Sequence, residues 1–134
     1  MIILFDLDST LVNFEGSDRL ASQKGVWPAI QAITKSEYNG YPKPITSIVE
    51  KTRMIAPSLD DLEELGKKYR YNITPWFKKL IDKLHNKWYL CGILTQSYEI
   101  AARPVATELG IDHRFIRGIK LVHDAEGNFV DLYP

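Results

Sequence analysis

The sequence lacks any excess of charge and has almost no cysteine. Its 17 lysine and arginine residues balance 17 aspartate and glutamate residues, so the formal net charge is zero. Nothing in this balance resembles the basic footprint of a nucleic-acid-binding protein or of a polybasic membrane anchor. The single cysteine, Cys91, allows no disulfide within the chain, which fits a reducing compartment. A length of 134 residues with 45% hydrophobic composition predicts one domain with its own core, together with a small inserted subdomain.

Long apolar runs and metal-ligand clusters are also missing from the sequence. The N-terminal run "MIIL" follows no basic region and is too short for a signal sequence or a membrane-spanning helix. We therefore expect a cytoplasmic protein that does not enter a membrane. The three histidines, at positions 85, 113 and 123, have no ligand spacing to one another or to Cys91, so a zinc site is not expected.

Short apolar segments alternate with amphipathic helical patterns. "MIILFD" and "YLCGILT" predict buried strands, and we expect the first to be a central strand of a parallel sheet. Between them, residues 14–72 have a helical pattern broken at "GVWP", "NGYPKP" and "APSLDD", which predicts an insert of three to four helices. Helices are also predicted from Thr74, as an N-cap, and over "SYEIAARPVATELGI". In the latter, Gly110 marks the end and Pro104 a bend or a break.

The C-terminal residues predict a short strand and a β-hairpin. In the hairpin, "IKLVH" and "NFVDL" flank "DAEG", with Gly127 in the turn. Strands that alternate with helices predict an α/β fold with a parallel sheet. We expect an α/β core made of residues 1–13 and 73–134, and a helical subdomain made of residues 14–72.

Acidic and hydroxyl side chains follow the two predicted strands. Asp6 and Asp8 stand in "FDLDSTLV", and Thr95 ends "YLCGILT"; ligands of parallel sheets bind at the carboxyl ends of strands. Two close carboxylates repel unless a proton or a metal separates them. One could be a nucleophile or a Mg²⁺ ligand, and the other a proton donor. Alternatively, the two acids only end the strand in an Asx turn and Thr95 only caps a helix.

These motifs resemble the haloacid dehalogenase superfamily. "DLDSTLV" is similar to its first motif, Asp-x-Asp-x-Thr, in the form frequent in the phosphoserine-phosphatase-like branch, and "WYLCGILTQS" is similar to its second motif. The helical insert and the hairpin "GIKLVHDAEGNFVDL" have counterparts in that branch, so the resemblance covers the whole chain. It implies a Rossmann-like core with a parallel sheet, a helical cap inserted after the first strand, and a C-terminal β-hairpin.

The resemblance also implies the mechanism of a Mg²⁺-dependent phosphomonoester hydrolase. Asp6 would attack phosphorus to form an aspartyl-phosphate, and Asp8 would protonate the leaving alcohol and then activate water. Mg²⁺ would take the Asp6 carboxylate and the Asp8 backbone carbonyl as ligands. Thr95 would bind a phosphoryl oxygen, helped by backbone N–H groups near Gln96 and Ser97 at a helix start.

The same resemblance assigns residues to the substrate, which we expect to be a small phosphorylated metabolite such as phosphoserine. Glu15 stands where this branch places an acid that binds the substrate ammonium. Arg53 is the candidate for the cap arginine that binds the substrate carboxylate, and Lys51 could align there instead; either could also be solvated surface charge. A nucleotide phosphatase of the same superfamily stays open, with Phe14 and Trp27 stacking on a base.

The chain departs from the family toward its C-terminal end. It reaches "FVDLYP" without the lysine of the family's third motif or the Gly-Asp-x-x-x-Asp-like acids of the fourth. Each loss could cost roughly 3–4 kcal/mol, and together on the order of 10⁴-fold in rate.

Three hypotheses follow from this departure. The chain is part of a longer phosphatase, or it is completed by a homo-oligomer or another chain that covers an open sheet edge. In the third, it is a non-catalytic module that holds a phosphorylated ligand through Thr95 and the cap. Whether these residues make an enzyme by themselves is therefore left open by the sequence.

Overall fold

The computed structural model describes residues 1–40 and 44–134, which form two compact units. The first unit comprises Met1–Gly16 and Leu62–Lys120, and the second comprises Ser17–Asp61 and Leu121–Pro134. This division differs from the expected one in three places. The hairpin groups with the cap helices, whereas residues 14–16 and most of the fourth helix group with the core. Within the described ranges, no helix is both long enough and apolar enough to cross a membrane.

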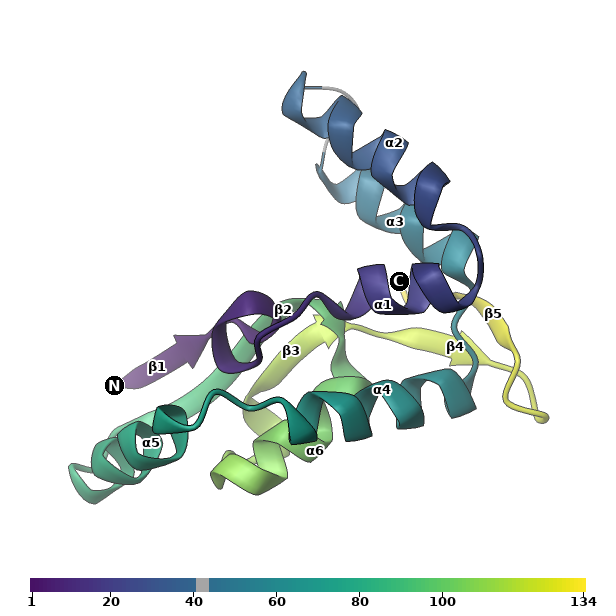
Figure 1. Cartoon of the computed structure of the whole chain (residues 1–134). Helices are drawn as coiled ribbons and strands as arrows, with labels where there is room; N and C mark the ends of the chain where they lie inside the picture. The colour runs from purple at the N-terminus through teal and green to yellow at the C-terminus, as the bar shows by residue number, and fades with distance from the viewer. Residues whose placement is uncertain (41–43) are drawn as a thin grey trace. The chain divides into compact units, whose positions relative to one another are not determined.

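A three-stranded parallel sheet forms the centre of the first unit (Figure 1). β2 (Leu90–Tyr98) lies in the middle, and its register with β1 (Ile2–Phe5) pairs Ile2 with Leu90 and Phe5 with Ile93. The expectation that the first strand is central was therefore wrong for the described sheet, where β1 is an edge strand and Leu4 is 50% exposed. The strands are β1 (Ile2–Phe5), β2 (Leu90–Tyr98) and β3 (Ile116–Ile119).

The two faces of β2 have different surroundings because side chains alternate along a strand. Cys91 and Ile93 are buried on the face that α5 (Trp76–Asn86) and α6 (Glu99–Leu109) cover (Figure 1). Leu90 points to the other face, where half of its surface is exposed. The apolar core of this unit therefore lies between the sheet and its helices.

Helix α4 (Leu59–Tyr71) runs from the second unit into the first. Ser58 caps it, since Ser58 Oγ accepts the Asp61 N–H and the Asp61 carboxylate accepts the Ser58 N–H. Further along, Gly66 lets α4 approach α6, because an added Cβ would lie 3.0 Å from Pro104 Cγ. Helix α6 continues through Pro104 without the break that the sequence allowed for.

The predicted helix stop is confirmed and one predicted cap is wrong. Gly110 ends α6 in the left-handed conformation, with φ of 72°. Thr74 was expected to cap α5, but its hydroxyl donates to the Thr10 carbonyl instead, at 3.2 Å. The Thr74 side chain therefore ties the start of α5 to the loop that follows β1.

The second unit contains the remaining helices and the hairpin. Gly127, with φ of 85°, forms the predicted turn, and the Leu59 N–H donates to the Gly127 carbonyl. The Arg53 guanidinium forms a fork with the Asp131 carboxylate, which joins α3 to the hairpin. With α4, the described insert has the expected number of helices. The elements of this unit are α1 (Gly16–Gln23), whose first residue belongs to the first unit, α2 (Trp27–Tyr38), α3 (Pro44–Ile55), β4 (Leu121–His123) and β5 (Phe129–Leu132).

The burial of Ile93 in the central strand generates a test of the core. We expect Ile93→Ala to lower the free energy of unfolding by about 2–5 kcal/mol, because a fully buried side chain leaves a cavity. Leu90→Ala on the opposite face of the same strand should cost less than about 1 kcal/mol, because half of Leu90 is already in water. Urea unfolding of both variants measures the difference, and equal losses would contradict this assignment of the two faces.

Candidate active site

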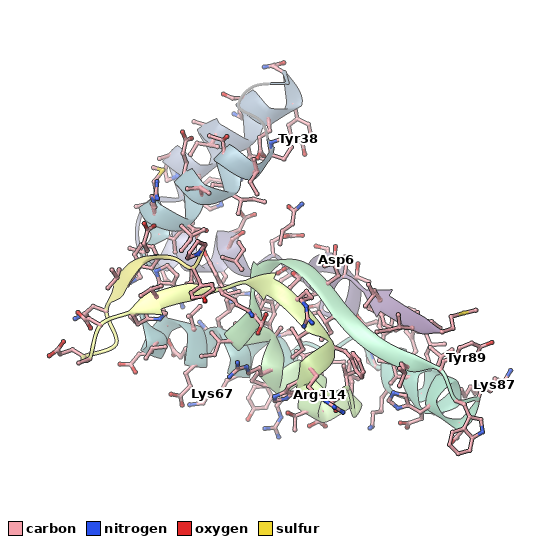
Figure 2. All side chains as sticks on the ribbon, turned by 180° about the vertical axis from the view of Figure 1, so that it is seen from behind. Asp6, Tyr38, Lys67, Lys87, Tyr89 and Arg114 are labelled. Atoms are coloured by element: carbon pink, nitrogen blue, oxygen red, sulfur yellow. The ribbon has the colours of Figure 1, made fainter. Side chains whose placement is uncertain are left out.

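Asp6 lies directly after β1, at the carboxyl end of the parallel sheet. Figure 2 shows it just past the end of β1, at the end of the sheet opposite to Lys87 and Tyr89. Phe5 pairs with Ile93, so the chain after β1 emerges beside the stretch of β2 that contains Thr95. The Asp6 side chain is exposed, and one of its oxygens accepts the Leu7 N–H at 2.8 Å.

The chain then makes one wide helical turn over Leu7–Leu11, with Asp8 inside it. Leu7 and Leu11 are fully buried, and the Val12 N–H donates back to the Leu7 carbonyl at 3.1 Å. Asp8 and Ser9 depart from helical geometry, and Ser9 adopts a left-handed φ of 54°. Two buried leucines therefore anchor the turn and hold its polar residues at the end of the sheet.

Asp8 is half-buried and is held mainly through one of its two oxygens. Its Oδ1 accepts hydrogen bonds from the Gly16 N–H and from the Tyr69 hydroxyl, both at 2.7 Å. Its Oδ2 receives only a longer one from the Thr95 hydroxyl, at 3.5 Å. Burial raises the pKa of the Asp8 carboxyl above its ordinary value, although the hydrogen bonds from Tyr69 and Gly16 act in the opposite direction.

Glu15 lies at the same site and is bound by a residue of the turn. The Ser9 hydroxyl donates to Glu15 Oε1 at 2.6 Å, and the Ser9 N–H donates to the Phe14 carbonyl at 3.2 Å. These contacts close the segment between Ser9 and Glu15 into a compact loop. The left-handed backbone of Ser9, which is uncommon for a residue other than glycine, aims its side chain at Glu15.

The region around Thr95 differs from the prediction in one respect. Strand β2 continues to Tyr98 and α6 begins at Glu99, so Gln96 and Ser97 lie in the strand and not at a helix start. The Ser97 N–H donates to Thr95 Oγ1 at 3.0 Å, so this N–H already has a hydrogen-bond acceptor within the chain. Gln96 is exposed at the site, whereas Ser97 is buried beneath it.

A pocket of about 620 Å³ unites most of the predicted residues. Three carboxylates and no cation are among its lining residues, so the pocket repels a phosphate unless positive charge is added. The side-chain atoms of the lining residues that could act as metal ligands are oxygens, which suits a hard divalent cation such as Mg²⁺. The described residues hold no group of three or more histidine, cysteine or acidic side chains arranged around one metal position. The pocket is lined by Asp6, Asp8, Glu15, Leu94, Thr95 and Gln96.

The candidate residues from the cap helices have partners inside the second unit. Arg53 pairs with Asp131 through two hydrogen bonds of 3.1 and 3.2 Å, and Lys51 pairs with Glu37 at 2.9 Å. The role of Arg53 as a ligand of the substrate carboxylate stays a prediction.

The two aromatic residues of the nucleotide alternative lie in different units. Phe14, in the first, stacks on Tyr69 with ring centroids 5.1 Å apart, and Trp27 lies in the second. One face of the Phe14 ring is thus already occupied by a residue of the same unit.

Sequence reasoning missed Tyr69 and Gly16, which both bind Asp8. Tyr69 continues the buried stripe of Leu62 and Leu65 on α4, so its spacing indicated a core residue and gave no sign of a polar partner. Only glycine fits at position 16, because a Cβ there would collide with the Tyr69 hydroxyl. The Tyr69 contact with Asp8 joins residues 61 positions apart, whereas Gly16 lies eight positions from Asp8.

Comparison with known proteins identifies relatives of the chain. The family model for haloacid dehalogenase-like hydrolases matches residues 3–128. A phosphoserine phosphatase of Methanocaldococcus jannaschii is 32% identical, over 94% of this chain and 62% of that protein. The phosphoserine phosphatase of Rattus norvegicus is 27% identical, over 81% of this chain and 48% of that protein. The chain thus spans about half to three fifths of the length of these relatives.

Solved structures show the same fold. A structure described as a phospho-aspartyl intermediate analogue of phosphoserine phosphatase matches with a TM-score of 0.76 and 28% identity, over 98% of this chain and 61% of that one. A phosphoserine phosphohydrolase-like protein from Francisella tularensis matches with a TM-score of 0.83 and 24% identity, over 98% of this chain and 63% of that one. The second likeness concerns the fold alone.

The contact between Gly16 and Tyr69 generates a stability prediction. We expect Gly16→Ala to lower the free energy of unfolding by about 1–3 kcal/mol, because its methyl group would occupy the position of the Tyr69 hydroxyl. Ser22→Ala, at an exposed position of the same helix, should stay within about 0.5 kcal/mol of the wild type. Urea unfolding compares the two, and a Gly16→Ala chain as stable as the wild type would contradict the close approach.

The raised pKa of Asp8 generates a prediction about pH. Between the pKa values of the unfolded and folded chains the folded chain binds more protons, so ionisation of Asp8 lowers stability as pH rises through that range. Asn at this position cannot ionise, and its amide oxygen can still accept the hydrogen bonds from Gly16 and Tyr69. We expect Asp8→Asn to be more stable than the wild type near pH 7, with a difference that shrinks below about pH 4.

Urea unfolding at both pH values, with a chelator present, measures this difference. An Asp8→Asn chain that is less stable than the wild type at neutral pH would show that the hydrogen bonds to the ionised carboxylate outweigh its burial.

Proposed function

Since the chain belongs to the haloacid dehalogenase-like hydrolases, we propose that its pocket hydrolyses a small phosphomonoester through an aspartyl-phosphate at Asp6. The proposed activity is Mg²⁺-dependent and of the phosphoserine phosphatase type. The family match and the phosphoserine phosphatase relatives support the reaction class. The pocket supports the assignment of roles within that class.

The observation that carries the proposal is the unequal environment of the two aspartates in one pocket. Asp6 is exposed, whereas Asp8 is half-buried and has a raised pKa. A pair of carboxyl groups with different environments can divide the roles of nucleophile and proton donor. Asp6 therefore suits the nucleophile, and Asp8 suits the group that carries a proton.

In the first step, a carboxylate oxygen of Asp6 attacks phosphorus and the bond from phosphorus to the substrate oxygen breaks. Asp8 gives its proton to that leaving oxygen, so an alcohol departs and Asp8 becomes ionised. Thr95, at the edge of the same pocket, offers a hydroxyl that can hydrogen-bond a phosphoryl oxygen. It would exchange its long contact with Asp8 for that bond.

In the second step, ionised Asp8 takes a proton from a water molecule as that water attacks the phosphorus of the aspartyl-phosphate. The bond from Asp6 to phosphorus breaks, inorganic phosphate leaves, and Asp8 is again protonated. Each group therefore returns to its starting state after one turnover.

The negative charge of the pocket supports the need for a divalent cation. The Asp6 carboxylate and the Asp8 backbone carbonyl are the atoms that would hold Mg²⁺, which when bound neutralises phosphoryl and carboxylate charge. Three lining carboxylates would otherwise oppose a phosphate dianion. Two protein ligands are few for this ion, so we expect weak binding and slow turnover by this chain alone.

Glu15 supports an amine-bearing substrate such as phosphoserine. Its Oε1 is bound by the Ser9 hydroxyl, which orients the carboxylate so that its second oxygen can meet an ammonium group. A nucleotide substrate receives less support, because Phe14 already stacks on Tyr69.

This proposal predicts Mg²⁺-dependent release of phosphate that requires Asp6. We expect the wild-type chain to hydrolyse phosphoserine faster than a nucleoside monophosphate, and Asp6→Asn to lower kcat/KM by about 10⁴-fold or more, because the nucleophile is lost. Phosphate release with Mg²⁺ and with a chelator measures both effects. Asp60→Asn, at an exposed position of α4, is the matched control and should keep the wild-type rate.

Equal activity of Asp6→Asn and wild type would exclude the aspartyl-phosphate. Binding of phosphoserine without turnover would favour a module that only holds a phosphorylated ligand.

A further inference from the structure

The Tyr69 hydroxyl joins three segments of the first unit around Asp8. Tyr69 comes from α4 and is completely buried. Its Oη lies 2.7 Å from Asp8 Oδ1, in the turn after β1, and 2.8 Å from Ser97 Oγ, near the end of β2. Tyr69 does not line the pocket, so any effect on the reaction must act through the residues that it binds.

The chemistry of these groups decides the direction of the hydrogen bonds. Asp8 Oδ1 accepts hydrogen bonds both when the carboxyl is ionised and when its proton is on Oδ2. The single phenolic proton of Tyr69 is therefore donated to Asp8 Oδ1, and Oη accepts from the Ser97 hydroxyl. Burial, followed by the charge of Asp8, raises the pKa of Tyr69, which keeps the phenol protonated. The Ser97 hydroxyl therefore donates to Tyr69 Oη, and the Tyr69 hydroxyl donates to Asp8 Oδ1, in one chain of hydrogen bonds.

This chain makes the two oxygens of Asp8 unequal. Oδ1 accepts two short hydrogen bonds, from Tyr69 and Gly16, both at 2.7 Å. Oδ2 has only the 3.5 Å contact with Thr95, which lines the pocket. Oδ2 is thus the oxygen whose lone pairs are less engaged and which lies beside a pocket residue.

The Tyr69 ring has little freedom to move away from this position. Phe14 stacks on it with an interplanar angle of 26°, and Gly16 leaves no space for any atom larger than hydrogen beside the hydroxyl. A close-packed ring keeps its position because displacement would force neighbouring side chains out of their contacts. The Asp8 carboxylate is therefore held by a rigid donor.

We propose that Tyr69 is a positioning residue that fixes Asp8 through Oδ1 and so directs proton transfer to Asp8 Oδ2. The inference rests on the proposed function, because it concerns the proton that passes between Asp8 and the leaving alcohol. Without the Tyr69 hydroxyl, only the Gly16 N–H still holds Oδ1, so the carboxylate gains freedom to turn away from the orientation that places Oδ2 beside the pocket. Orientation of this kind matters because a small misplacement of a catalytic group can cost roughly 10²-fold in rate.

Tyr69→Phe tests the inference because it removes only the hydroxyl and keeps the ring that stacks on Phe14. The readout is kcat/KM for two substrates, phosphoserine and p-nitrophenyl phosphate. The alkoxide of serine needs a proton as it leaves, whereas nitrophenolate leaves without one. We expect Tyr69→Phe to lower kcat/KM for phosphoserine roughly 10- to 100-fold and for p-nitrophenyl phosphate by less than about threefold.

The matched control is Tyr71→Phe, which makes the same change two residues further along α4, where the side chain is exposed. It should leave both rates unchanged. An equal loss on both substrates would assign Tyr69 a structural role only, and no loss on either would remove it from the reaction; both results overturn the inference. A wild-type chain inactive on both substrates would instead overturn the proposed function, and the catalytic part of the inference with it.

A double-mutant cycle tests the contact independently of activity. Urea unfolding is measured for wild type, Tyr69→Phe, Asp8→Ala and the double variant. If Tyr69 holds Asp8, the double variant is more stable than the two single effects predict, by about tenfold in the unfolding equilibrium constant. Additive effects would show that the hydroxyl does not hold the carboxylate and would overturn the inference whatever the rates.

Discussion

The parallel pairing of β1 with β2 is the constraint on which the site depends. Because the two strands run in the same direction and pair Phe5 with Ile93, the residues that follow these two positions lie at the same end of the sheet. Asp6 and Thr95 are nearly 90 positions apart in the sequence, yet they line one pocket for this reason. A slip of one residue in this register would place the Thr95 side chain on the opposite face of the sheet. The buried residues Cys91 and Ile93, packed under α5 and α6, hold the register.

At Asp8, burial and hydrogen bonding have opposite effects on the pKa of the carboxyl group. Burial opposes the charged carboxylate, and two short hydrogen bonds favour it. Burial is the larger effect, so the pKa rises and the residue holds a proton more readily than an exposed aspartate does. The hydrogen bonds then serve orientation more than ionisation, since both of them meet the same oxygen. Asp6 lies two residues away but is exposed, because Leu7 between them points into the core and the turn carries Asp8 inward.

The two units differ in how their charged side chains are paired. The pocket of the first unit is lined by carboxylates, whereas Lys51 and Arg53 of the second unit are paired with Glu37 and Asp131. The Arg53–Asp131 pair is about half exposed, and pairs of this kind contribute only about 0–1 kcal/mol. Loss of the Arg53–Asp131 pair would therefore lower the stability of the fold only slightly. The proposed phosphate site, by contrast, needs positive charge that its own lining residues do not supply, which makes the divalent cation central to the proposed reaction.

The sequence alone was enough to establish the α/β class, the helical insert, the hairpin at Gly127 and the position of Asp6 and Asp8 just after the first strand. These features depend on local signals, namely apolar runs, caps and turn residues, which act over a few positions. The order of strands, the continuation of β2 to Tyr98 and the partners of Asp8 were decided only by the tertiary structure. Tyr69 has the spacing of a core residue, and its hydroxyl acquires a role only when folding brings α4 against the turn after β1. That contact joins residues 61 positions apart, and no periodicity along the chain encodes it.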